Sequence, residues 1–265
     1  MKERVISAIF MLIIFVPILL LGSMPFYLLS LVLGIISLYE LLNLNKKLPK
    51  IVKIITYLFT SLLIFNKLET KNFLLNLDFR FFIFLLFVYL ALLVFINKQD
   101  IDKYNYKDAF YLIGIVLFIG ISFNNFIHIR NIGLYLMIYL FLITILTDTF
   151  ALFIGKSFGK HKLAPLISPN KTIEGAVGGS VVATILASLF YIFVVKDYSS
   201  IIIVIVLTFI LSVVGQLGDL IKSSIKRHAG IKDFSNLIPG HGGILDRLDS
   251  IIFVMMAYIL ISNLF

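Results

Sequence analysis

Cysteine is absent from this 265-residue chain. Its absence excludes a disulfide framework, a zinc site built on thiolates and catalysis by a cysteine nucleophile. Any metal ion must therefore be held by oxygen or imidazole ligands. Charged residues are also scarce, at 14% of the chain, whereas 60% of the residues are hydrophobic. This composition argues against a soluble domain, because one globular core could not bury apolar runs that recur along the whole length.

Long apolar runs predict an all-α fold, that of a polytopic integral membrane protein with about nine transmembrane helices, since about 20 apolar residues cross the hydrocarbon core. The first run follows Met-Lys-Glu-Arg but lacks an Ala-x-Ala cleavage site, so we expect a retained helix and no signal peptide. The predicted spans are Val5–Leu21, Phe26–Leu42, Ile51–Phe65, Phe81–Ile96, Ala109–Phe123, Gly133–Phe153, Ala176–Val195, Ile201–Leu217 and Leu245–Leu264.

The sequence shows no internal repeat and no long extramembrane segment, which predicts a single membrane domain over residues 1–265. Within it, we expect N-terminal helices in residues 1–132 and catalytic helices and loops in residues 133–265. The second half is assigned the chemistry because its Gly, Pro, Lys, His and Asp residues gather around helix ends.

Basic residues set the predicted orientation. The net charge of +9 does not indicate nucleic-acid binding, because membrane segments interrupt the basic residues. With the N-terminus in the cytoplasm, all but five of the 23 Lys and Arg residues fall in inside segments. This asymmetry predicts a multi-pass protein of the cell inner (cytoplasmic) membrane with its N-terminus inside. The five outside residues are Lys67, Lys71, Arg80, Arg130 and Lys196.

Two groups of polar residues with helical spacing indicate a site for a metal ion and phosphate. If the eighth span continues as a helix, Asp219, Lys222, Ser223 and Lys226 share one face. At the start of the ninth span, Asp246 and Asp249 are three residues apart and also share a face. Two close carboxylates repel each other unless a cation lies between them, and oxygen ligands suit magnesium or manganese. We therefore predict Asp219, Asp246 and Asp249 as metal ligands.

A glycine-rich loop precedes the ninth span, with Gly240, Gly242 and Gly243 around His241. Such a loop can bring backbone N–H groups close to an anion. A glycine-rich turn before a helix is more often a plain connector. The neighbouring Asp, Lys and Arg residues favour phosphate binding here.

The stretch from Ser224 to Asp249 resembles the signature of the phosphatidate cytidylyltransferase family. Its elements are Ser-x-x-Lys-Arg, Lys-Asp, Pro-Gly-His-Gly-Gly and Asp-Arg-x-Asp. The matching positions are Ser224, Lys226, Arg227, Lys232, Asp233, Pro239, Gly240, His241, Gly242, Gly243, Asp246, Arg247 and Asp249. A second stretch, Asp148–Gly179, resembles the family's Asp-x-x-Ala, Gly-x-x-x-Gly and Ser-Pro-x-Lys-Thr-x-Glu-Gly segment, with Leu152 in place of the usual aromatic residue.

The resemblance implies that CTP and phosphatidic acid react to give CDP-diacylglycerol and pyrophosphate at the cytoplasmic membrane face. It implies Mg²⁺ as cofactor, alone or with a second cation, and a homodimer among membrane lipids. Lys171, Lys226, Arg227 and Arg247 would clamp anionic oxygens, and His241 would hold pyrophosphate or pass a proton. Ser224, Gly240, Gly242 and Gly243 are predicted as cofactor-binding residues, with the glycine-rich loop around phosphate. The role of Asp148, an ionisable residue within a span, stays open between function and pairing with a lysine.

Two other functions remain. Another metal-dependent lipid transferase would also place Asp clusters at a membrane face, although the Asp-x-x-Asp-Gly-x-x-Ala-Arg and Asn-Asp-x-x-Asp motifs are missing from this chain. A cation-coupled transporter would use Asp148 and Asp219 near the bilayer midplane, although no inverted repeat is evident. We expect Lys156, Lys160 and Lys162 to contact anionic lipid heads in any of these cases.

Overall fold

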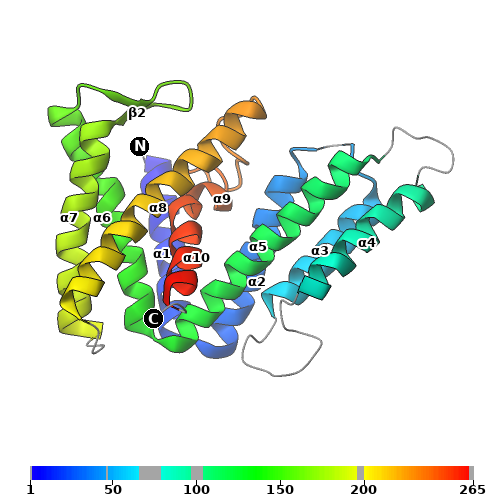
Figure 1. Cartoon of the computed structure of the whole chain (residues 1–265), viewed down its shortest axis with the longest axis horizontal. Helices are drawn as coiled ribbons and strands as arrows, with labels where there is room; N and C mark the ends of the chain where they lie inside the picture. The colour runs from blue at the N-terminus through cyan, green and yellow to red at the C-terminus, as the bar shows by residue number, and fades with distance from the viewer. Residues whose placement is uncertain (1, 46, 66–78, 97–103, 196–199, 263–265) are drawn as a thin grey trace. The chain divides into compact units, whose positions relative to one another are not determined.

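The computed structural model describes residues 2–45, 47–65, 79–96, 104–195 and 200–262, and these residues are mainly helical (Figure 1). Lys46, Lys67, Lys71, Lys98, Lys103 and Lys196 of the predicted charge pattern lie outside the described residues, as does the last part of the span predicted to end at Leu264. The chain forms two compact units, residues 21–128 and residues 1–20 with 129–265. The prediction of a single membrane domain stays a prediction.

The unit of residues 21–128 contains α2 (Ser23–Leu42), α3 (Lys50–Ile64), α4 (Phe79–Ile96) and most of α5 (Tyr106–Ile132). Polar side chains join these helices within an apolar core. The amide of Asn124 donates to the last carbonyls of α3, at 3.0 Å from Ile64 O, and Tyr111 donates to Leu41 O at 2.9 Å. Both bonds satisfy carbonyls at helix ends, which would otherwise lack partners in an apolar medium.

The other unit contains α1 (Lys2–Leu21), α6 (Leu134–Phe158), β1 (Lys162–Ala164), β2 (Ser168–Thr172), α7 (Ile173–Phe190), the π-helical turn η2 (Tyr191–Val195), α8 (Ile201–His228), α9 (Ile244–Arg247) and α10 (Asp249–Ser262). Five of the described helical segments are long and apolar enough to cross a membrane: Ser23–Leu42, Tyr106–Ile132, Leu134–Phe158, Ile173–Val195 and Ile201–His228. The helical membrane architecture is confirmed at this level, and the count of about nine spans is not.

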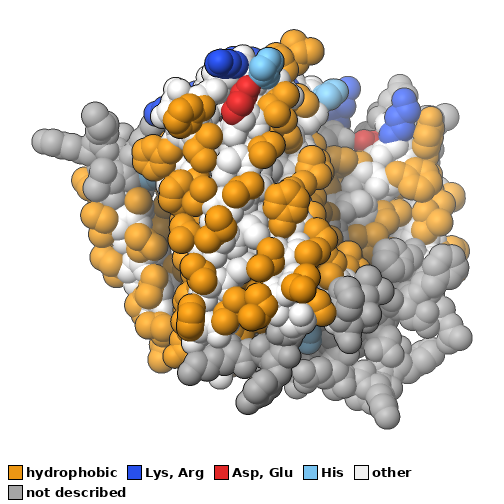
Figure 2. Space-filling view, turned by 60° about the vertical axis from the view of Figure 1, so that its left-hand side comes forward, with side chains coloured by type: hydrophobic (Ala, Val, Ile, Leu, Met, Phe, Trp, Pro, Cys, Tyr) orange, Lys and Arg blue, Asp and Glu red, His pale blue; other side chains and the backbone are white. Residues whose placement is uncertain are grey.

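The outer face of α7 and its neighbours is apolar. Exposed side chains on α7 include Val177, Val181, Ile185 and Leu189. Figure 2 shows hydrophobic side chains over most of this face, with Lys, Arg, acidic and His side chains gathered at one end. An apolar band with a charged edge is the surface that a bilayer and its interface require.

The structure adds a β-hairpin and a helix break to the predicted spans. Ser168–Thr172, between the sixth and seventh predicted spans, is a strand that pairs antiparallel with Lys162–Ala164. The ninth span, expected to run unbroken from Leu245, is divided into α9 and α10 at Leu248. The ammonium of Lys222 lies 3.3 Å from Leu245 O, so the carbonyl that a continuous helix would use internally has a side-chain donor.

Small residues allow α6 and α7 to pack closely. A Cβ on Gly179 would lie 2.7 Å from Thr147 O and 2.8 Å from Ala151 N, and both of these atoms belong to the α6 backbone. Backbone atoms cannot move aside as a flexible side chain can. The interface therefore requires glycine at this position, as in other close helix pairs in membranes.

We predict that Gly179→Ala lowers the free energy of unfolding by about 1–3 kcal/mol, because the added methyl group forces the two backbones apart. Gly114→Ala, in α5, is the matched control, because a Cβ there would meet no atom within 4 Å. The control should be neutral or stabilising, since alanine favours helices over glycine. Thermal melting followed by circular dichroism measures both variants. An unchanged melting temperature for Gly179→Ala would contradict the packing.

Candidate active site

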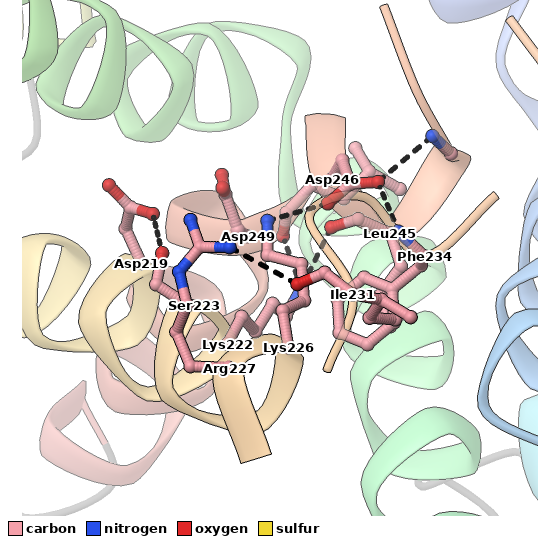
Figure 3. A network of polar contacts seen from close by, with 12 residues as sticks. Asp219, Lys222, Ser223, Lys226, Arg227, Ile231, Phe234, Leu245, Asp246 and Asp249 are labelled. Atoms are coloured by element: carbon pink, nitrogen blue, oxygen red, sulfur yellow. Dashed lines mark hydrogen bonds and ion pairs between the residues drawn. The ribbon is translucent and has the colours of Figure 1, made fainter. Parts of the chain in front are cut away.

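The C-terminal end of α8 carries a polar face. Asp219, Lys222, Ser223 and Lys226 all lie within this helix, which confirms the predicted continuation of the eighth span. Ser223 donates to Asp219 Oδ1 at 3.3 Å along the helix. Figure 3 shows this face directed at α9, at the start of α10 and at the loop that precedes them.

Lys226 and Asp246 form a buried ion pair. Lys226 Nζ lies 2.7 Å from Asp246 Oδ1, and the two residues are 8% and 5% exposed. The other oxygen of Asp246 accepts the N–H groups of Phe234 at 2.8 Å and Gly243 at 2.9 Å. One carboxylate of α9 therefore connects α8 with two separate points of the loop.

Lys222 is a second buried cation on this face and is only 2% exposed. It donates to Leu245 O at 3.3 Å and to Leu248 O at 3.1 Å. Its ammonium also interacts electrostatically with Asp249, Asp246 and Asp219. A cation beside the last carbonyls of a helix is favourable, because these groups carry partial negative charge. The prediction of site residues omitted Lys222, although its spacing from Asp219 already placed it on the polar face.

Lys171 and Asp219 form an ion pair that joins β2 to α8, and both side chains are partly exposed. Asp219 and Asp249 point to the same side in Figure 3, whereas Asp246 points toward the loop backbone. Asp249 lies at the start of α10 and interacts electrostatically with Asp219, Lys222 and Asp148. Asp148, on α6, also interacts with Lys171. The sequence left the role of Asp148 open, and the structure adds it to this charged cluster.

Several polar side chains of otherwise apolar helices gather around Asp148. They include Thr144, Thr147, Ser212, Gln216 and Ser250. Thr147 and Ser212 are 2.8 Å apart, and Gln216 donates to Ser180 Oγ at 2.7 Å. These bonds hold α6, α7 and α8 together next to the charged cluster.

The balance of charge favours a cation at the cluster. Its members are the carboxylates of Asp148, Asp219, Asp246 and Asp249 and the ammonium groups of Lys171, Lys222 and Lys226, so it has one more negative than positive charge. Among the residues that the structure describes, no three acidic or histidine side chains come close enough to form a metal cage. Magnesium does not need one, because it commonly binds one or two carboxylates and takes water and phosphate as further ligands.

Asp219 and Asp249 fit such an ion, since both are partly accessible carboxylates that point the same way. Asp246 fits it less well, because its oxygens already accept from one ammonium group and two backbone N–H groups. The assignment of Asp246 as a metal ligand stays a prediction, and these contacts favour the ion pair.

The glycine-rich loop is a tight turn. Gly240 and Gly242 have φ angles of 74° and 82°, which L side chains rarely adopt. The N–H groups of His241 and Gly242 both donate to Ile238 O, and that of Gly243 donates to Asp246. Three of the four N–H groups from Gly240 to Gly243 thus have acceptors within the chain. Phosphate binding by these glycines stays a prediction.

The remaining predicted site residues are at least partly exposed. Arg227 is exposed and donates to Ile167 O at 3.3 Å and to Ile231 O at 3.1 Å, so it links the β-hairpin to the loop after α8. Arg247 is exposed at the end of α9. Ser224 is half-buried, and its carbonyl accepts from His228 Nδ1 at 2.9 Å. Their predicted contacts with substrate stay predictions.

The β-hairpin is held to the start of α7 by Glu174. The carboxylate accepts the N–H groups of Lys160 at 3.0 Å and His161 at 3.2 Å, and it lies 2.6 Å from His161 Nδ1. Thr172 caps the helix by accepting the Gly175 N–H at 3.1 Å. These bonds fix the strand that carries Lys171.

Known enzymes of one class are similar to this chain over nearly its whole length. A model of the "Cytidylyltransferase family" matches residues 2–265. A phosphatidate cytidylyltransferase of Staphylococcus haemolyticus is 40% identical over 256 residues, which cover 96% of each chain. Enzymes of the same name from Staphylococcus saprophyticus and Staphylococcus aureus are 40% and 39% identical, again over 96% of each chain.

We predict that Lys226→Met lowers the free energy of unfolding by about 3–5 kcal/mol, because it leaves the Asp246 carboxylate buried without its ammonium partner. Arg227→Met is the matched control, since it removes a neighbouring but exposed cation and should cost about 1 kcal/mol or less. The chain contains no tryptophan, so circular dichroism is the suitable probe of unfolding. Equal losses of stability in the two variants would contradict the buried pair.

Proposed function

This chain belongs to the cytidylyltransferase family and forms CDP-diacylglycerol and pyrophosphate from CTP and phosphatidic acid, and we propose that it does so with magnesium at the end of the membrane helices that carries Asp219 and Asp249. The observation that carries this proposal is the charged cluster. It brings partly accessible carboxylates and Lys171 together beside a group of fixed cations.

The reaction needs neutralisation of charge more than a strong base. A phosphate oxygen of phosphatidate attacks the α-phosphorus of CTP and forms the new P–O bond. The bond between the α-phosphorus and its bridging oxygen breaks, and pyrophosphate leaves with that oxygen. Phosphate is already ionised at neutral pH, so catalysis depends on positioning and on stabilisation of the negative charge.

The residues divide into two groups by their contacts. Asp219 and Asp249 would hold the magnesium ion, which when bound neutralises phosphate charge as a Lewis acid. Lys171 is partly exposed and Arg247 is exposed at the same end, and both would bind the anionic oxygens of the substrates. Lys222 and Lys226, by contrast, have buried partners within the chain, so we assign them to positioning.

The arrangement also supports one membrane face for the whole site. Lys171 pairs with Asp219, and Arg227 bonds to Ile167, so the hairpin after α6 and the end of α8 lie together. The 25 residues of α6 separate this end from Asn131, and a helix of that length spans about 37 Å, enough for the hydrocarbon core. The excess of Lys and Arg in the predicted inside segments supports the cytoplasmic face of the inner membrane, with the N-terminus inside. The homodimer stays a prediction from family resemblance.

We predict that Asp219→Asn and Asp249→Asn each raise the magnesium concentration needed for half-maximal activity by about tenfold or more, because each removes a charged ligand. Asp249→Glu is the control and should keep most of the affinity, since it retains the carboxylate. The assay is incorporation of labelled CTP into lipid with phosphatidate and graded magnesium. Unchanged magnesium dependence in both Asn variants would remove these residues from the metal site, and no lipid product from the wild-type protein would contradict the function.

We predict that Asn236→Cys reacts with a membrane-impermeant maleimide added from the cytoplasmic side and that Asn131→Cys reacts from the other side. Both positions are exposed, and the natural chain has no cysteine that would add background. The experiment uses right-side-out and inverted vesicles. Labelling of Asn236→Cys in intact right-side-out vesicles would contradict the proposed orientation.

A further inference from the structure

Ser7 lies against the glycine-rich loop, although it is 234 residues away from His241 in the sequence. It belongs to α1, outside both motif segments, and α1 is part of the same compact unit as the loop. The Ser7 hydroxyl oxygen is 2.7 Å from His241 Nδ1 and 3.1 Å from Pro239 O. One hydroxyl group therefore contacts both the histidine ring and the backbone of the turn that carries it.

The chemistry of these groups favours one tautomer of the histidine. A serine hydroxyl has a single hydrogen to donate, and the Pro239 carbonyl can only accept. When Ser7 donates to Pro239, its oxygen can only accept from His241, so Nδ1 must carry a hydrogen. The neutral ring then has its lone pair on Nε2. The opposite tautomer would need the serine hydrogen for Nδ1 and would deprive the Pro239 carbonyl of this donor.

The backbone of the turn leaves the histidine little freedom. The His241 N–H donates to Ile238 O at 2.9 Å, and glycines with positive φ stand on both sides of the residue. A rigid backbone with a fixed Nδ1 partner orients an imidazole ring in the way that second partners orient catalytic histidines elsewhere.

We propose that Ser7 is a positioning residue that keeps a hydrogen on Nδ1 of His241, so that Nε2 alone accepts or donates the hydrogen bond to substrate phosphate. The proposal rests on the proposed function and on the role that the family resemblance implies for His241, in which the ring contacts pyrophosphate or passes a proton. In the neutral ring Nε2 accepts a proton, and in the charged ring Nε2–H donates to an anionic oxygen. Nδ1–H stays bonded to Ser7 in both states, so proton exchange does not disturb the ring's orientation.

Three variants test the proposal in the full-length protein. Ser7→Ala removes the hydroxyl, Ser7→Thr retains it, and Ser157→Ala is the matched control, because Ser157 is an exposed serine of α6 near the hairpin. Nitrogen NMR of protein labelled at its four histidines reports the tautomer, and the His241 signals are identified by their loss in His241→Gln. The same preparations are assayed for labelled CDP-diacylglycerol.

The wild type, Ser7→Thr and Ser157→Ala should show His241 with hydrogen on Nδ1 and similar turnover. Ser7→Ala should lose this tautomer preference and about tenfold or more in turnover, the loss typical for removal of a partner that orients a functional histidine. An unchanged tautomer in Ser7→Ala overturns the proposal, even if activity falls, because Ser7 would then act only in packing. A changed tautomer with full activity in both Ser7→Ala and His241→Gln would also overturn the proposal, because His241 would then have no role in turnover, whereas the formation of labelled CDP-diacylglycerol would leave the proposed function standing.

Discussion

The buried ion pair between Lys226 and Asp246 is the interaction on which the rest of the site depends. Taking two charges out of water is costly, and the attraction between them offsets this cost only when further hydrogen bonds complete the geometry. Here Asp246 also accepts two backbone N–H groups of the intervening loop, those of Phe234 and Gly243. A long loop between two membrane helices is thereby closed around a single carboxylate.

The charged residues of the site fall into a buried group, which includes this pair, and a partly accessible group. Lys222, Lys226 and Asp246 are buried and bonded within the chain, and they define where α8, the loop and α9 lie. Asp219, Asp249 and Lys171 are partly accessible and stand beside this framework. Groups that stay fixed while charge moves cost no reorganisation during the reaction, which is the main source of electrostatic catalysis. The accessible groups can then exchange partners with a cation and phosphate.

Sequence patterns predicted the features that depend on periodicity. The polar face of α8 followed from spacings of three and four residues, and the long helices followed from their apolar runs. The family motifs indicated the family, which the match over residues 2–265 confirms, and the choice of the segments that carry the chemistry stays a prediction. These features could be predicted because they are set by local geometry and by residue type.

The features that were not predicted depend on partners far away in the sequence. Hydropathy gave one helix from Leu245 onward, because it cannot show that Lys222 bonds to the Leu245 carbonyl. Spacing grouped Asp246 with Asp249, whereas the tertiary fold turns Asp246 toward Lys226 and the loop. The contact of Ser7 with His241 has no local signal at all, since α1 lies outside both motif segments.

The central proposal is that Asp246 holds α8, the loop and α9 together, whereas Asp219 and Asp249 bind the cation. A crystal structure with manganese in place of magnesium tests it directly, because anomalous scattering locates the ion without reference to the assigned ligands. The account predicts a peak at about 2.1–2.2 Å from oxygens of Asp219 and Asp249, with the bond between Lys226 and Asp246 intact. A peak coordinated by Asp246, with Lys226 displaced from it, would contradict the account.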